Sequence, residues 1–186
     1  MKIINIFKHL NLVNKHRWLV FKLSIKAGIP FRGLVHDLSK YSPSEFFEGV
    51  KYYNGKISPI KVCKQKNGYS KAWLHHKGRN KHHHEYWYDY AAPDVAALMP
   101  YKYFAEMVCD TLAAGMTYQG KKWTGDYQLK YYLKDRERKH INPKIDSMLL
   151  EVYNRVSEKG VNEVVKPKVL KKIYNSYAGD VSDKKY

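Results

Sequence analysis

A long run of helical periodicity at the start of the chain constrains its fold more than any other feature. From Ile3 to Ile25 the apolar side chains fall at helical spacing, and neither glycine nor proline interrupts them. This run predicts one long amphipathic helix, with Gly28 as its C-cap and Pro30 as its stop. No stretch of the sequence alternates apolar and polar residues in the way that is typical of a half-buried strand. The expected class is therefore all-α.

Prolines, glycines and capping residues divide the rest of the chain into further helical segments. Their expected ranges are Ile29–Leu38, a helix from Pro43 through Val50, Tyr101–Met116, Trp123–Lys139 and Pro143–Lys159. Ser42 and Glu45, on either side of Pro43, predict a capping box at the start of the second of these helices. Residues 53–69 hold glycine, proline and several lysines, which predicts a long loop lying beside a pocket as a lid.

A chain of 186 residues is expected to form one main domain with a trailing segment. Residues 1–160 are predicted to form a helical metal-binding domain, and residues 161–186 a basic C-terminal helix and frayed tail, the helix running from Val165 to Tyr177.

The two cysteines, Cys63 and Cys109, show no CxxC spacing and argue against a disulfide framework. We find no signal peptide and no apolar run of roughly 18 residues, so a cytoplasmic protein without membrane association is expected.

The net charge of the chain indicates what kind of partner it would bind. With 34 basic and 17 acidic residues the formal net charge is +17, which favours an anionic small molecule, most simply a phosphorylated one, or nucleic acid. Lysine-rich segments lie at Lys121–Lys122, Lys130–Lys139 and Lys166–Lys172. Solvated helix faces would give the same pattern, and the sequence does not determine the oligomeric state.

The main candidate for chemistry is the pair His36–Asp37, flanked by apolar residues and followed by Lys40. An imidazole and a carboxylate on one turn can bind the same metal ion. His16 upstream and Asp110 downstream offer further ligands of the same kinds. Lys40, just beyond the pair, is expected to hold a phosphate as a point charge.

A cluster of histidines between residues 75 and 84 adds more donors: His75, His76, His82, His83 and His84. His76 and His83 are seven apart and would share a helical face, as would His75 and His82, but Gly78 leaves the continuity of that helix open. One or two of these histidines would surround two metal ions together with His16, His36, Asp37 and Asp110. Asp37 would bridge the two ions, and a water molecule between them would be activated as the nucleophile. The alternative is a surface tract that binds metal only adventitiously.

The order of a first His, then His-Asp, further histidines and a distant Asp resembles the HD-domain superfamily of metal-dependent phosphohydrolases. The resemblance covers His16 to Asp110 and implies an HD-domain-like helical bundle, with residues 36–40 similar to that superfamily's HDxxK form. The histidine segment, with Asn80, Glu85, Tyr86 and Trp87, more closely resembles an uncharacterised bacterial and phage family known only as a domain of unknown function.

Carried over residue by residue, the resemblance implies a metal-ligand set of His16, His36, Asp37, His76, His83 and Asp110. It gives Asp37 and Lys40 catalytic roles, and places Asn80, His82 and Glu85 in the second shell or against substrate. The cofactor would be two divalent ions, chosen among manganese, iron, magnesium, cobalt and nickel. The interval between the extra histidines is shorter than in well-studied two-metal HD enzymes.

Three functions follow from these observations. The first is an HD-type phosphohydrolase that uses metal-activated water on a nucleotide or other phosphate ester. The second, from the same resemblance, is an HD-fold oxygenase with a mixed-valent di-iron pair. The third is a basic helical module that binds nucleic acid and uses metal only for structure.

Overall fold

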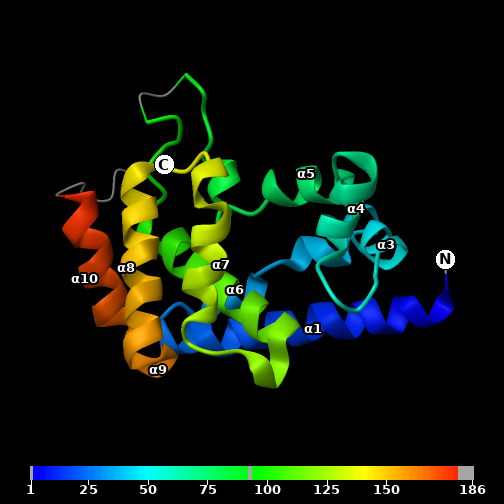
Figure 1. Ribbon diagram of the computed structural model, residues 1–186, viewed down its shortest axis with the longest axis horizontal. Helices are drawn as coiled ribbons and strands as arrows, with labels where there is room; N and C mark the ends of the chain where they lie inside the picture. The colour runs from blue at the N-terminus through cyan, green and yellow to red at the C-terminus, as the bar shows by residue number, and fades with distance from the viewer. Residues whose placement is uncertain (1, 92–93, 180–186) are drawn as a thin grey trace.

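The computed structural model describes residues 2–91 and 94–179 and confirms the all-α class. Over these residues the chain forms α-helices and short 3₁₀ turns, with no strand and a single isolated bridge between Tyr88 and Ala96 (Figure 1). The α-helices are α1 Ile3–Lys26, α2 Pro30–Val35, α3 Pro43–Lys51, α4 Pro59–Asn67, α5 Lys71–Lys77, α6 Tyr101–Gln119, α7 Tyr127–Asp135, α8 Pro143–Lys159, α9 Val161–Val164 and α10 Pro167–Ala178. The 3₁₀ turns are η1 Leu38–Tyr41, η2 His84–Tyr86, η3 Gly120–Lys122 and η4 Arg136–Arg138.

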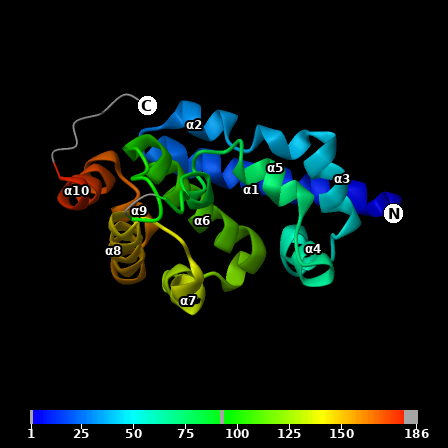
Figure 2. The same ribbon diagram turned by 90° about the horizontal axis from the view of Figure 1, so that it is seen from above.

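Helix α6 is the centre of the hydrophobic core. Phe104, Val108 and Leu112 follow one another at four-residue intervals on one face of the helix, and all three are fully buried. Helix α1 packs along α6, and α7, α8 and α10 also contact it. Helices α8 and α10 lie side by side at one end of the molecule, while α3, α4 and α5 gather beside the N-terminal half of α1 (Figures 1 and 2). The long α1 helix therefore connects the two ends.

Several predicted boundaries agree closely with the structure. Helix α1 ends at Lys26, just before the predicted C-cap at Gly28, and α8 has the predicted bounds. Gly28 adopts a left-handed φ of 73°, one residue beyond the C-cap position at Ala27. Pro30 does not merely stop α1, because it occupies the first position of α2, where its fixed φ suits a helix.

The predicted loop at residues 53–69 is wrong over most of its length, because helix α4 occupies Pro59–Asn67. The residues that suggested a loop mark the ends of this helix. Pro59 is its first residue, and Gly68 ends it in the left-handed conformation with a φ of 79°.

Helix α10 packs against α8 and α6, and its Leu170 and Ile173 are buried in the common core. The division of the chain at residue 160 stays a prediction. Residues 180–186, where a frayed tail is expected, lie outside the described residues. Among the helices that the structure does describe, none combines the length and the apolar character needed to cross a membrane.

Gly28 offers a test of how α1 meets α10. A Cβ at this position would lie 2.7 Å from Cγ of Pro167, and the φ of 73° is unfavourable for any side chain. We expect Gly28→Ala to lower the free energy of unfolding by about 2–3 kcal/mol, measured by urea denaturation. Gly68→Ala is the matched control, because its φ is 79° with no atom within 4 Å, so only the backbone cost of about 1 kcal/mol should remain. Equal losses in the two variants would contradict the close approach to Pro167.

Candidate metal centre

The His36–Asp37 pair lies in a sharp turn just after α2. The sequence places the pair at the end of a helix reaching Leu38, but α2 ends at Val35. Asp37 adopts a left-handed backbone with a φ of 54°, a conformation that Asp tolerates better than most residues. Arg17 of α1 holds this turn, because its guanidinium donates hydrogen bonds to the carbonyl oxygens of Leu34 and His36 at 2.8 and 2.7 Å. The two side chains consequently point away from α2 and toward α1 and α6.

The turn brings four predicted ligands into one group, which we call the first group: His16, His36, Asp37 and Asp110. Nε2 of His16 lies 3.0 Å from Oδ1 of Asp110, and Nε2 of His36 lies 3.2 Å from Oδ2 of Asp37. Because α1 and α6 pack side by side, side chains far apart in sequence meet here. All four side chains are almost completely buried.

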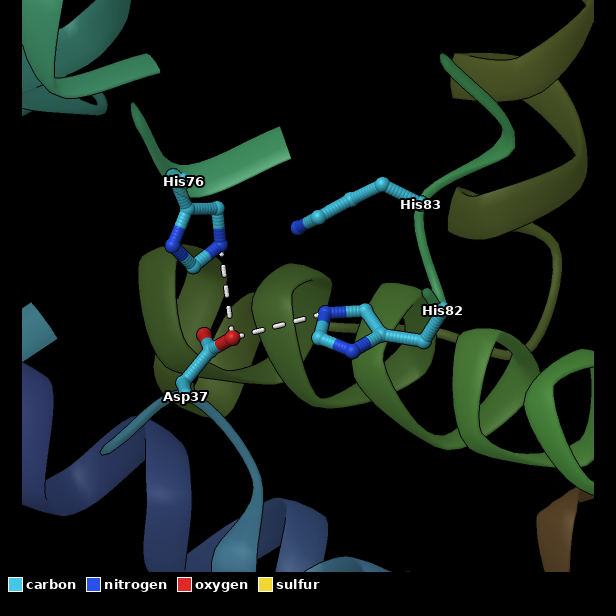
Figure 3. Close-up of side chains that lie close together, drawn as sticks. All are labelled: Asp37, His76, His82 and His83. Atoms are coloured by element: carbon cyan, nitrogen blue, oxygen red, sulfur yellow. Dashed lines mark ion pairs between the residues drawn. The ribbon is translucent and has the colours of Figure 1, made fainter. Parts of the chain in front are cut away.

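Asp37 also belongs to a second group, with His76, His82 and His83. Its Oδ1 oxygen lies 3.3 Å from Nε2 of His76 and 3.4 Å from Nε2 of His82. Figure 3 shows the Asp37 carboxylate between these two rings, with the His83 ring directed toward the same space. The Asp37 carboxylate is thus shared between the two groups, with a different oxygen toward each.

The second group contains one histidine more than the predicted ligand set. His82 was expected in the second shell, but the structure places it against Asp37, together with His76 and His83. His76 and His83 do not share a helical face, because α5 ends at Lys77. A turn leads from this helix to His82 and His83. His75 contacts Glu45, and His84 lies 3.1 Å from Glu85, so neither belongs to the two groups.

Both groups have the properties of metal sites. Nε2 of His83 is buried without a hydrogen bond to any described residue, and Nε2 of His16, His36 and His82 each face a carboxylate oxygen at 3.0–3.4 Å. Two donors each about 2.1 Å from one ion lie about 3.0 Å apart at a right angle and about 3.4 Å apart at the tetrahedral angle. The separations of 3.0–3.4 Å given above match those values. The residues of each group could therefore hold a metal ion, and Asp37 belongs to both groups.

The protonation states suit cations. Burial works against the charged form of Asp37, but the neighbouring His36 and Lys40 charges hold its pKa well below the usual value. Burial also acts on Asp110, yet hydrogen bonds from His16 and His36 keep its pKa well below the usual value. Burial lowers the pKa of His83, which leaves this ring neutral with a free lone pair. Asp37, Asp110 and His83 thus present negative oxygens and a neutral imidazole nitrogen, the forms that bind metal.

The pKa values of His82 and His36 shift the other way. Burial disfavours the cation of His82, but hydrogen bonds to Asp37 and Glu106 raise its pKa. Burial also disfavours the cation of His36, but the Asp37 charge and hydrogen bonds to carboxylates of Asp110, Asp37 and Glu106 raise its pKa well above the usual value. A metal ion that binds Nε2 of His36 must therefore displace a proton.

The remaining predicted site residues have distinct surroundings. Nζ of Lys40 lies 2.6 Å from Oδ2 of Asp37, so this lysine is paired with the shared carboxylate. Asn80 donates to Oγ of Ser39 at 2.9 Å and to the carbonyl oxygen of His76 at 2.8 Å, so it braces the second group from outside. Glu85 lies beside the adjoining cavity.

Two buried glutamates support the histidines and were not predicted. The expected capping box is wrong: the Ser42 side chain makes no capping hydrogen bond, and the Glu45 carboxylate instead contacts Nδ1 of His75 at 2.6 Å and of His76 at 2.7 Å. Glu106 contacts Nδ1 of His36 at 3.0 Å. The sequence does contain a sign of Glu106, because it lies one turn before Asp110 on an otherwise apolar helix face.

A cavity of about 470 Å³ adjoins both groups, and His16, His76, His83 and Asp110 form part of its wall. Four lysines from different parts of the chain also line it: Lys40, Lys56, Lys61 and Lys139. Aromatic side chains supply much of the remaining wall, including Trp73, Tyr118, Tyr127 and Tyr131. A cavity of this size accepts a small organic molecule, and the lysines favour an anionic one.

Comparison with known proteins identifies the family. The sequence profile of a family of unknown function, DUF5662, matches residues 5–155, a range that includes every residue of both groups. This agrees with the resemblance of the histidine segment to a domain of unknown function. No curated protein matches the sequence, and no solved structure matches the fold. Because the match covers most of the chain, the protein belongs to the DUF5662 family.

Proposed function

We propose that this protein is a metal-dependent phosphohydrolase of the HD type, acting on a nucleotide or another phosphate ester. The observation that carries the proposal is the sharing of Asp37 between two groups of buried donors beside a lysine-lined cavity. The order of residues along the chain supports the HD comparison, with His16 first, His36–Asp37 next and Asp110 last.

Each residue has a part in this proposal. His16, His36 and Asp110 would hold one divalent ion, His76, His82 and His83 the other, and Asp37 both. The ions would supply a nucleophile from water near neutral pH and polarise the phosphoryl oxygen. Lys40 keeps its positive charge, because the Asp37 and Asp110 charges raise its pKa despite burial. It would offset the charge of the phosphate.

The donors narrow the choice of metal. Five imidazoles and two carboxylates make up the two groups. Magnesium prefers oxygen ligands and keeps much of its bound water, so it suits this donor set poorly. Manganese also binds imidazole less well than iron, cobalt or nickel do. Within the expected set of metals, the proposal therefore favours iron, cobalt or nickel.

The direct test is phosphate release from a panel of nucleotides and simple phosphate esters, with the protein loaded in turn with each of the five metals. We expect turnover of at least one substrate with at least one metal, and its loss when a chelator is added. His140→Gln is a suitable control, since His140 is exposed and lies outside both groups, and it should retain full turnover. No phosphate release with any metal would contradict the proposal.

A di-iron oxygenase is the second candidate, and the histidine-rich donor set favours it, because imidazole suits iron. Oxygen uptake by the iron-loaded protein without phosphate release would support it. Phosphate release by protein free of iron would eliminate it.

A further inference from the structure

Glu106 lies at the junction of the two groups. It is on α6, one turn before Asp110, and only 1% of its surface is exposed. Its Oε1 oxygen is 3.0 Å from Nδ1 of His36 and 3.2 Å from Nδ1 of His82. His36 belongs to the first group and His82 to the second, so one oxygen contacts a histidine of each.

The hydrogen bond to His36 and the ion-pair contact with His82 both favour a proton on Nδ1 of the ring. An ionised carboxylate only accepts hydrogen bonds, so an imidazole nitrogen facing it must be the protonated one. In a neutral ring the proton on Nδ1 leaves the lone pair on Nε2. Nε2 of His36 is directed at Asp37 and Asp110, and Nε2 of His82 at Asp37, as their separations of 3.2–3.5 Å show. Glu106 thus turns both lone pairs toward the places where ions would bind.

Arg32 fixes the glutamate in this position. Its Nε and Nη2 atoms lie 2.7 and 2.5 Å from Oε2 of Glu106, a two-point contact that leaves Oε1 for the histidines. Glu106, His36 and His82 are close enough to bind an ion themselves. The guanidinium on Glu106 argues against this, because it already neutralises the carboxylate and would repel a nearby cation.

Glu45 provides an internal comparison. Its Oε2 oxygen contacts Nδ1 of His76, and its Oε1 oxygen contacts Nδ1 of His75, which belongs to neither group. Glu45 therefore supports the second group alone, whereas Glu106 supports both.

We infer that Glu106 is a positioning residue shared by the two ion sites, so that its loss weakens both ions together. The inference rests on the proposed function insofar as two ions must bind. A carboxylate behind a metal-binding histidine fixes the ring and raises its basicity, and its removal typically lowers metal affinity about 10–100-fold.

Calorimetric titration of metal-free protein with Co²⁺, alongside the absorption spectrum of the bound ion, tests this role. For the wild type we expect two ions per chain. Glu106→Gln should weaken both binding steps by about 10–100-fold, because the neutral amide no longer raises the basicity of the rings and its NH2 group must face either the Nδ1 donors or Arg32. Glu45→Gln should weaken one step by a similar factor and leave the other unchanged. Unaltered affinity for either ion in Glu106→Gln would overturn the inference.

Circular dichroism in chelator establishes that each variant is folded before titration. Arg32→Gln is a second variant for the case in which Glu106→Gln does not fold, because it loosens the glutamate without removing its carboxylate. It should also weaken both steps, and a loss confined to one step would overturn the shared role. Wild-type protein that binds no Co²⁺ would overturn both the inference and the two-ion site. Two ions in the wild type with unchanged variants would overturn the inference alone.

Discussion

Replacing Asp37 with asparagine is expected to remove both ions and to lower phosphate release by more than about 10³-fold. Asp37 is common to both groups, with Oδ1 directed to the second and Oδ2 to the first. Asparagine keeps the size of the side chain but loses its charge, and its amide nitrogen must face one of the groups. One ion then loses a ligand to a hydrogen-bond donor, and the other loses the negative charge that balanced it.

The measurement is the number of ions per chain after dialysis, by elemental analysis, together with kcat/KM for the best substrate of the panel. Asp146→Asn is a matched control, since this carboxylate forms hydrogen bonds with Arg136 and Tyr132 away from both groups. It should retain two ions and full turnover. An Asp37→Asn protein that retains both ions, or that turns substrate over at the wild-type rate, would show that the carboxylate does not link two sites.

Much of the fold could be predicted because its helices carry their own boundaries. Helix α8 begins at a proline and ends before Gly160, and its apolar residues keep one face between these limits. Helix α4 was missed because it is short and lysine-rich, with Pro59 and Gly68 so close together that they suggest a loop. Its stability depends on packing against α3, a contact that local sequence does not reveal.

The candidate site likewise contains residues that the sequence could predict and residues that it could not. His16, His36, Asp37 and Asp110 could be proposed because they are the residue types that metals require, and the structure brings them together. The place of His82 beside His83 could not, because it depends on the path of the turn after α5. The support from Glu106 and Glu45 was equally hidden, since these contacts span 70 and about 30 residues of sequence.

The second large effect concerns stability. In the metal-free protein, the buried Nε2 of His83 lacks a hydrogen bond, and the carboxylates of Asp37 and Asp110 stand close together, a costly arrangement that cations would relieve. An ion present at a hundred times its dissociation constant stabilises the folded state by about 2.7 kcal/mol, so two independent ions contribute about 5 kcal/mol. For a chain of this length we expect the Tm to rise by about 10–20 °C on metal loading.

Thermal unfolding followed by circular dichroism, in excess chelator and then in excess Co²⁺, measures this shift. Asp37→Asn is the informative control, because a variant that binds no ion should unfold at the same temperature in both conditions. If metal stabilised this variant as much as the wild type, the ions would be binding elsewhere, for example at exposed histidines. A wild-type Tm that does not change with metal would mean that the buried donors are satisfied without ions, and the two groups would then be polar core and no metal centre.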